Sequence, residues 1–314
     1  MIRFSNESIR QQRNRMILHC SISSFMFIKT TRSSHKPPLI TANQVSIKGH
    51  NEQLCPTRFC CCGRRHLIEA AAATALLPLN PSTSAAASDS TTMLNKVHPP
   101  RPDWYEEFYA SVMNKTMKSY EAEIAGYKSQ LFGNYLKGKA EKVLEIGIGT
   151  GPNLNYYAND TDIQVFGMDP NKKMEKYAQA AAVAAGLPLT KFKFVQAVGE
   201  AIPLSDASVD AVVGTLVLCS VKDVDMTLQE VKRVLKPGGI YLFVEHVAAK
   251  DGTSLKFWQS VLDPLQQIVA DGCHLTRETG KNISEAGFSG VDLSMVFLSN
   301  ASLISPHVYG IACK

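Results

Sequence analysis

The amino-acid sequence predicts an α/β fold built on a mostly parallel sheet that ends in an antiparallel pair of strands. Three observations lead to this prediction. The apolar run at residues 143–146 breaks into a glycine-rich turn, short apolar segments then alternate with helical patterns, and the last two apolar segments have no helix between them. Strands that alternate with helices are joined by right-handed crossovers and run parallel, whereas strands joined without a helix pair antiparallel.

The chain of 314 residues begins with a basic segment. Residues 1–68 hold 11 Lys and Arg against two acids, a net charge of +9, whereas residues 69–314 hold 22 basic and 26 acidic residues, a net charge of −4. The first segment resembles a transit peptide to the chloroplast or, alternatively, to the mitochondrion; a disordered basic tail is the other interpretation. The remainder has no basic footprint for nucleic acid, so we expect no nucleic-acid partner.

Residues 69–102 predict a signal-like segment and a linker. Two arginines precede the apolar run at residues 70–79, which is too short to span a bilayer and resembles the core of a twin-arginine signal. A thylakoid-associated or lumenal protein would carry such an arrangement. Ser, Thr, Ala and Pro dominate residues 80–102, which we interpret as a linker. We therefore expect residues 1 to about 90 to be dispensable for the fold of one domain over residues 103–314.

Residues 103–138 carry apolar and aromatic positions at helical spacing, which predicts one or two helices before the first strand. The first strand then leads into a glycine-rich loop that opens a helix. Gly147, Gly149 and Gly151 remove side chains where the backbone turns and a ligand approaches, and Glu145 ends the strand where it can face that ligand. The dinucleotide-binding fingerprint is not met, because no glycine occupies its third position from either starting glycine.

The second predicted strand, residues 164–168, ends in Asp169. This acid follows Gly147 by 22 residues, about where a carboxylate accepts hydrogen bonds from both hydroxyls of a ribose. Further along we expect strands at 193–196, 209–218 and 240–245, a helix at 223–235 with a turn at 236–239, and a final hairpin of 291–298 with 307–312.

Four motifs in this order resemble the class I S-adenosylmethionine (SAM) methyltransferases, including the ubiquinone and menaquinone C-methyltransferases. They are Glu145–Gly151, Asp169-Pro170, Gly199–Leu204 and Arg233–Gly239. Later segments are similar to the methyltransferase-like thiol S-methyltransferases of animal microsomes and lipid droplets: Thr215–Val221, Glu245–Ala249, Val261–Pro264, Asp271–Glu278 and Pro306–Gly310. The second resemblance covers roughly residues 140–314.

The resemblance implies a Rossmann-like, seven-stranded and mostly parallel sheet with an antiparallel C-terminal hairpin, and SAM as the methyl donor. It also implies helices before the first strand that cover the cleft, and possible peripheral association with a membrane or lipid particle. The residues expected to bind the cofactor are Glu145, Gly147, Gly149, Gly151, Asp169, Pro170, Gly199, Glu200 and Leu216.

The acceptor is expected to be a small lipophilic molecule, with a thiol as the first candidate. Its pocket should be lined by Cys219, Ser220, Asp271, His274 and Arg277. Phe257, Trp258, Leu262, Leu265 and Ile268 lie at helical spacing and should add an apolar wall. His246 is the candidate proton acceptor, although a histidine that only holds a loop would fit the same position.

Alternatives to thiol methylation are C- or O-methylation of a quinone or phenolic precursor, and a SAM-fold protein that binds without turnover. A nicotinamide-dependent oxidoreductase is disfavoured by the glycine spacing and the terminal hairpin. The clustered Asp271, Cys273 and His274 match no standard zinc spacing, so the sequence predicts no metal. Oligomeric state is not predicted.

Overall fold

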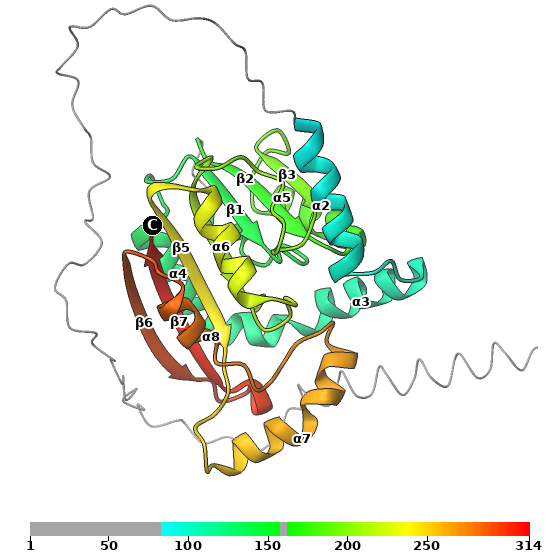
Figure 1. The fold of residues 1–314 in the computed structure, drawn as a ribbon, viewed down its shortest axis with the longest axis vertical. Coiled ribbons are helices and arrows are strands. Elements are labelled where there is room, and N and C mark those ends of the chain that lie inside the picture. The colour runs from blue at the N-terminus through cyan, green and yellow to red at the C-terminus, as the bar shows by residue number, and fades with distance from the viewer. Residues whose placement is uncertain (1–82, 158–161) are drawn as a thin grey trace, which may run out of the picture.

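The computed structural model describes residues 83–157 and 162–314. The predictions for the transit-like segment and the apolar run at 70–79 lie outside these residues. A seven-stranded sheet with the order β3-β2-β1-β4-β5-β7-β6 forms the centre of the fold (Figure 1). Its strands are β1 (Lys142–Ile146), β2 (Gln164–Asp169), β3 (Phe192–Gln196), β4 (Val209–Thr215), β5 (Leu235–His246), β6 (Gly290–Phe297) and β7 (Pro306–Cys313).

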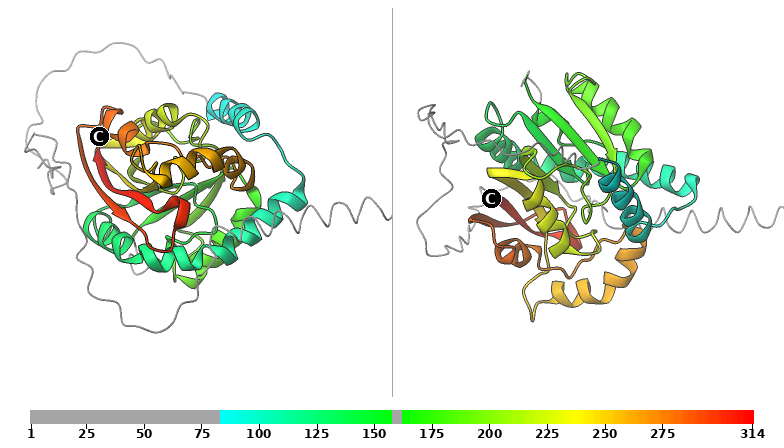
Figure 2. Two further views of the ribbon diagram at one scale, coloured as in Figure 1. Left: turned by 90° about the horizontal axis from the view of Figure 1, so that it is seen from below. Right: turned by 45° about the horizontal axis from the view of Figure 1, so that its top comes forward.

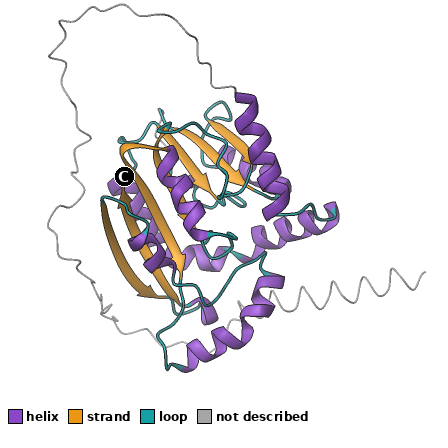
Figure 3. Cartoon of the chain, in the orientation of Figure 1, coloured by secondary structure: helices purple, strands orange, loops and turns teal. Residues whose placement is uncertain are grey.

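Strands β1 to β5 pair in parallel, and β7 pairs antiparallel with both β5 and β6. The predicted antiparallel hairpin is therefore confirmed, with β6 at the edge of the sheet (Figure 3). Strand order reverses between β1 and β4, because β1 continues to β2 on one side and β4 to β5 on the other. In open α/β sheets a ligand binds outside the carboxyl ends of the strands at such a reversal.

Side chains of the strands alternate between two apolar cores, one on each face of the sheet. Val143 and Val213 belong to one core with α4 (Lys118–Tyr135) and α5 (Glu175–Ala184). Leu144 and Val212 belong to the other, with α6 (Val224–Val234) and α8 (Thr279–Glu285). Figure 2 shows these helices on opposite sides of the strands. A strand buried on both faces reads as a continuous apolar run, which is why the sequence revealed these strands.

Several element boundaries differ from the sequence-based expectation. A helix, α2 (Thr83–Val97), occupies part of the predicted linker, and α3 (Asp103–Thr116) follows it. The expected helix after the glycine loop is only a 3-10 turn, η1 (Leu154–Tyr156). Strand β4 ends at Thr215, three residues early, because Leu216 has a φ of 55°. Among the described residues no helix is long and apolar enough to cross a membrane.

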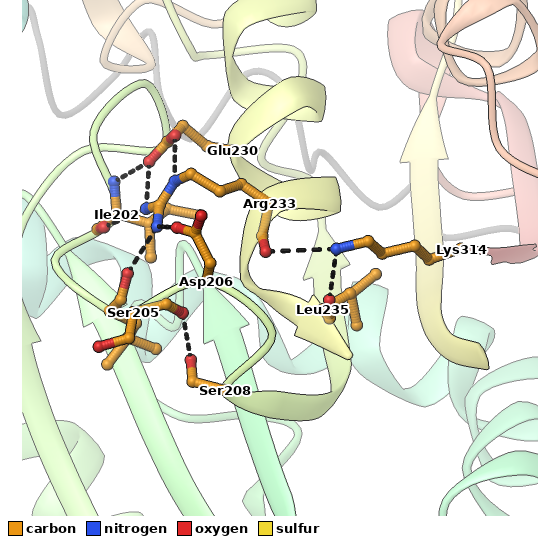
Figure 4. Close-up of polar contacts among 9 residues, drawn as sticks. Ile202, Ser205, Asp206, Ser208, Glu230, Arg233, Leu235 and Lys314 are labelled. Atoms are coloured by element: carbon orange, nitrogen blue, oxygen red, sulfur yellow. Dashed lines mark hydrogen bonds and ion pairs between the residues drawn. The ribbon is translucent and has the colours of Figure 1, made fainter. Parts of the chain in front are cut away.

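Arg233 at the end of α6 fastens the loop that follows β3 (Figure 4). Its guanidinium donates to the carbonyl oxygen of Ile202 at 2.8 Å and to Asp206 Oδ1 at 2.7 Å, and it pairs with Glu230. Glu230 in turn accepts a hydrogen bond from the Ile202 backbone N–H. These contacts fix the end of the Gly199–Leu204 motif against α6 and so place Gly199 and Glu200 at the ligand edge of the sheet.

Candidate active site

A cavity of about 450 Å³ opens at the carboxyl ends of β1 and β4. Its size falls in the range of small-molecule sites. It is lined by the glycine loop, the ends of β2 and β4, the loop after β3, the segment after α7 (Ser254–Val269) and the N-terminal helices α3 and α4. The cavity therefore sits at the reversal of strand order, where the fold predicts a ligand.

The glycine loop lines this cavity with backbone. Gly147 and Gly149 contribute directly, and both have positive φ values, 62° and 52°. A Cβ at Gly147 would stand 2.6 Å from a methyl carbon of Val217, so only glycine fits there. Gly151 does not line the cavity. A Cβ on it would meet Leu154 at 2.6 Å, and its φ is 80°, so its role is the turn itself.

Asp169 ends β2 at the cavity, followed by Pro170. One carboxylate oxygen accepts from the Gly149 N–H at 3.0 Å and the other from the Asn171 N–H at 2.9 Å. Burial raises the pKa of Asp169 to about 7, although these two hydrogen bonds oppose the shift. Each carboxylate oxygen can still accept one further hydrogen bond, which is what a pair of ribose hydroxyls would supply.

Glu145 does not line the cavity, although the sequence predicted that it would face the ligand. Its side chain lies beneath the glycine loop, 1% exposed, where it accepts from Asn153 Nδ2 at 2.9 Å and from the Tyr157 hydroxyl at 2.8 Å. Burial raises its pKa to about 7, and these two donors partly offset the shift. The acid therefore acts through the loop, because it holds the segment that follows Gly151 in place.

The opposite wall of the cofactor region comes from the loops after β3 and β4. Gly199, Glu200 and Leu216, which the sequence predicts to bind the cofactor, all line the cavity. Glu200 accepts from the backbone N–H groups of Lys222 at 2.6 Å and Asp223 at 3.1 Å, which ties the two loops together. The left-handed turn at Leu216 directs the chain across the cavity.

Four of the five predicted pocket residues line the cavity: Ser220, Asp271, His274 and Arg277. Arg277 donates to the carbonyl oxygen of Leu218 at 2.6 Å, and the His274 N–H donates to the carbonyl oxygen of Cys219 at 2.9 Å. The segment after α7 is thereby fastened to the loop after β4. His274 also contacts Asp263 through Nδ1, with 3.4 Å between Nδ1 and Oδ2.

Cys219 and His246 lie behind the wall of the cavity and do not line it. Both are buried, with exposed fractions of 2% and 1%. His246 Nε2 is 3.1 Å from the sulfur of Cys273, so this imidazole faces a buried thiol and not the acceptor space. The geometry does not support the expected role of His246 as a proton acceptor from substrate.

The N-terminal helices line part of the cavity. The sequence predicts these helices but not which of their residues face the cavity. Tyr109, Met113 and Met117 line the cavity from α3 and the residue after it, and Glu121 does so from α4. The helical spacing of Met113 and Met117 is visible in the sequence, and the resemblance implies helices that cover the cleft, but Tyr109 lies outside the predicted spacing. Which of their side chains face the cavity depends on how the helices dock.

Two residues of the predicted linker also reach the cavity. Arg101 forms an ion pair with Asp271, with 2.5 Å between Nη1 and Oδ1, and His98 Nε2 lies 3.4 Å from Asp271 Oδ2. Burial lowers the pKa of His98, but the hydrogen bond and charge of Asp271 outweigh it, so the pKa is raised above 6.5. The α2–α3 connection is thus pinned across the cavity to the segment after α7. No local motif marks either residue.

The apolar wall predicted from α7 is not formed. None of the five predicted residues lines the cavity: Leu262 is partly buried, and Phe257, Trp258, Leu265 and Ile268 are 42–64% exposed. Helix α7 turns these side chains outward, whereas only Gln267 from its last turn reaches the cavity. The helical spacing was right, but periodicity alone does not say which side of a helix faces a ligand.

The cavity is lined by a glycine loop and by the carboxylate of Asp169 at the end of β2. A 3-10 turn follows the loop where a diphosphate-binding site would need the start of a long helix. SAM has no diphosphate, and the residues present fit it. Fold and site together define a class I, SAM-dependent methyltransferase.

Comparison with known proteins agrees. Residues 144–243 match the methyltransferase domain family. The chain is 42% identical over 201 residues to a thiol S-methyltransferase of Homo sapiens, covering 62% of this chain and 81% of that protein. It is also 42% identical over 205 residues to a thiol S-methyltransferase of Rattus norvegicus, with 63% and 82% covered.

A solved complex of the Haloferax volcanii Trm112 methyltransferase activator with a putative methyltransferase shares the fold, with a TM-score of 0.52, 17% identity and coverage of 68% of this chain and 99% of that one. The chain belongs to the family of SAM-dependent methyltransferases that includes the two thiol S-methyltransferases. It is an enzyme whose methyl donor is SAM.

Proposed function

We propose that the protein methylates the sulfur of a small lipophilic thiol. The observation that carries this proposal is that Tyr109, Met113 and Met117 together line the cavity with apolar side-chain surface. Such a surface favours an uncharged, apolar acceptor, because a buried charge without a partner is costly. The two relatives that share 42% identity are named for thiol methylation, which supports the same acceptor class.

SAM would supply an electrophilic methyl group. The acceptor sulfur would attack that carbon with an electron pair to form the new C–S bond, while the bond from the carbon to the sulfonium breaks and S-adenosylhomocysteine leaves. The residues of the chain then have three tasks, which are to hold the two reactants in line, exclude water and take up the thiol proton. A thiol near neutral pH is already partly thiolate, so only modest help with the proton is needed.

His274 is the imidazole best placed to accept that proton. It lines the cavity, and its Nδ1 contacts Asp263 at 3.4 Å, while its Nε2 has no hydrogen-bond partner among the residues that the structure describes. Asp263 is itself fixed by the backbone N–H groups of Leu275 and Thr276. A carboxylate that orients one imidazole nitrogen leaves the other free for proton transfer.

A turnover assay with the purified protein tests the proposal. S-adenosylhomocysteine release should be robust with small alkyl and aryl thiols, weaker with the charged thiol glutathione, and absent with the corresponding alcohols. The rate should rise with pH toward the pKa of the thiol, because the thiolate attacks. His274→Gln should lower the rate mainly below that pKa. Transfer to phenols or quinone precursors with none to thiols would contradict the proposal and support the C- or O-methylation alternative.

A further inference from the structure

Three buried side chains that the methyl transfer does not use meet behind the wall of the cavity. Cys219 follows β4, His246 ends β5 and Cys273 lies between α7 and α8. Their exposed fractions are 2%, 1% and 8%. The two sulfur atoms and the imidazole nitrogen all lie within 4.8 Å of one another, and His246 Nε2 is 3.1 Å from the sulfur of Cys273.

The distances between ligand atoms in a tetrahedral zinc site fall between the shortest of these separations and their upper limit. With Zn–S near 2.3 Å and Zn–N near 2.0–2.1 Å, neighbouring ligand atoms stand about 3.6–3.8 Å apart. Two thiolates and an imidazole also match the ligand preference of zinc, whereas Mg²⁺ and Ca²⁺ favour oxygen. Sequence spacing gave no hint of this site, because its ligands come from three segments that are far apart in the chain.

The surroundings suit a neutral metal–dithiolate unit. A divalent ion with two thiolates and a neutral imidazole carries no net charge. The charged neighbours, Glu245 and Arg277, are of opposite sign.

A fourth ligand is available from Gln266. This residue is buried, its side chain hydrogen-bonds Cys273, and its Oε1 has no hydrogen-bond partner among residues 83–157 and 162–314. The oxygen and nitrogen of a side-chain amide can exchange places by a simple rotation. That rotation would present the unsatisfied oxygen to the cluster.

We propose that Cys219, His246 and Cys273 bind a zinc ion, with Gln266 or water as the fourth ligand. Binding displaces the thiol protons to solvent and changes no oxidation state. The ion would join the ends of β4 and β5 to the segment after α7. Three residues next to its ligands in the chain line the cavity: Ser220, Gly272 and His274. The metal would therefore position these lining residues without touching the substrate.

Metal analysis of the full chain, purified under reducing conditions from cells grown with zinc, tests this site. We expect about one zinc per chain. Cobalt exchanged into the site should give the thiolate-to-metal absorption of a tetrahedral centre. Cys219→Ser and Cys273→Ser should each lose the metal and this absorption. His274→Gln is the matched control, because His274 adjoins Cys273 but offers no ligand to the cluster, and it should keep both.

The reactivity of the two thiols toward an alkylating agent gives a second test that needs no variant, in case a variant fails to fold. In the unaltered protein, Cys219 and Cys273 should react slowly with iodoacetamide and become reactive after a strong chelator is added. Three results would overturn the proposal: a folded protein without zinc under reducing conditions, full retention of metal in both serine variants, or a disulfide between Cys219 and Cys273 in place of the metal.

Discussion

Asp169 and Glu145 are both buried carboxyl groups at the carboxyl ends of strands. Asp169 faces the cavity and keeps acceptor capacity for the cofactor, whereas both oxygens of Glu145 are engaged by Asn153 and Tyr157. Sequence position suggested the same role for both. The difference arises because Asp169 lies outside the glycine turn and Glu145 lies beneath it.

Asp169→Asn should weaken SAM binding. The amide keeps the shape of the side chain but loses the charge that strengthens hydrogen bonds from the ribose hydroxyls, a loss of about 1.5–3 kcal/mol. This corresponds to roughly a 10- to 150-fold higher Kd. Calorimetric titration with SAM measures it, and Asp292→Asn, an exposed acid on β6, controls for the change in net charge. An unchanged Kd would remove Asp169 from the cofactor site.

The affinity for SAM should also depend on pH through this residue. Its pKa is about 7 in the ligand-free protein, so the carboxylate is progressively protonated as the pH falls through 7. Only the carboxylate accepts both hydroxyl protons, so the Kd should increase as the pH decreases from 8 to 6. The Asp169→Asn variant should not show this dependence, and an equal slope in both proteins would assign it to another group.

At the scale of elements, the strands could be predicted from the sequence because they are buried on both faces. Helix α2 could not, because its Ala, Ser and Thr content resembles a linker. His98 and Arg101 follow it in the α2–α3 connection, and their partner Asp271 is 170 residues or more away in the chain. The sequence predicts that apolar residues of α7 line the acceptor pocket. Periodicity identifies the apolar face of a helix but not what that face packs against. The placement of His246 was missed because its neighbour Cys273 belongs to a distant segment.

The ion pair between the α2–α3 connection and Asp271 should help to close the cavity. Arg101→Ala removes its shortest contact, and because Arg101 is one-third exposed we expect a loss of about 1 kcal/mol or less. SAM should then dissociate up to about fivefold faster, as measured by stopped-flow displacement. Lys96→Ala, an exposed basic residue of α2, is the control. Equal dissociation rates in both variants would mean that the pair does not close the site.

At the scale of the whole molecule, the buried carboxyls give the fold an unusual pH dependence. Glu145, Asp169 and Glu245 each have a pKa of about 7, raised mainly by burial from 4.5, 3.8 and 4.5. Between the ordinary pKa of each carboxyl and its raised value, the folded chain holds more protons than the unfolded chain. The free energy of unfolding therefore decreases as the pH rises through this interval. His307, whose pKa is lowered to about 4, acts in the opposite direction but only below 6.5.

The thermal midpoint of the ligand-free protein should therefore decrease as the pH is raised from 6.5 to 8. Saturating SAM should reduce the decrease, because it favours the ionised form of Asp169. Calorimetry at several pH values tests this, and Glu145→Gln should flatten the slope by removing one of the three groups. A midpoint that does not decrease over the same interval would contradict these raised pKa values, because carboxyls that are ionised in both states contribute no slope.

The basic segment at residues 1–68 still carries the prediction of a chloroplast address, with the mitochondrion as the alternative, and the signal-like segment follows it from residue 69. Fused to a fluorescent protein, residues 1–82 alone should direct it to plastids in plant cells, and a chain that begins at residue 83 should remain in the cytosol. Targeting that is unaffected by removal of residues 1–82 would contradict the prediction.

The most direct test of the central claim follows the methyl group itself. The purified protein is incubated with SAM that carries a trideuterated methyl group and with a small alkyl thiol, and the products are analysed by mass spectrometry. We expect the labelled methyl on the sulfur of the thiol, with one S-adenosylhomocysteine formed for each thioether. Asp169→Asn should give roughly 10- to 150-fold less product at low SAM, in line with its higher Kd. Tight SAM binding without any labelled thioether, across lipophilic thiols and pH values, would contradict the account.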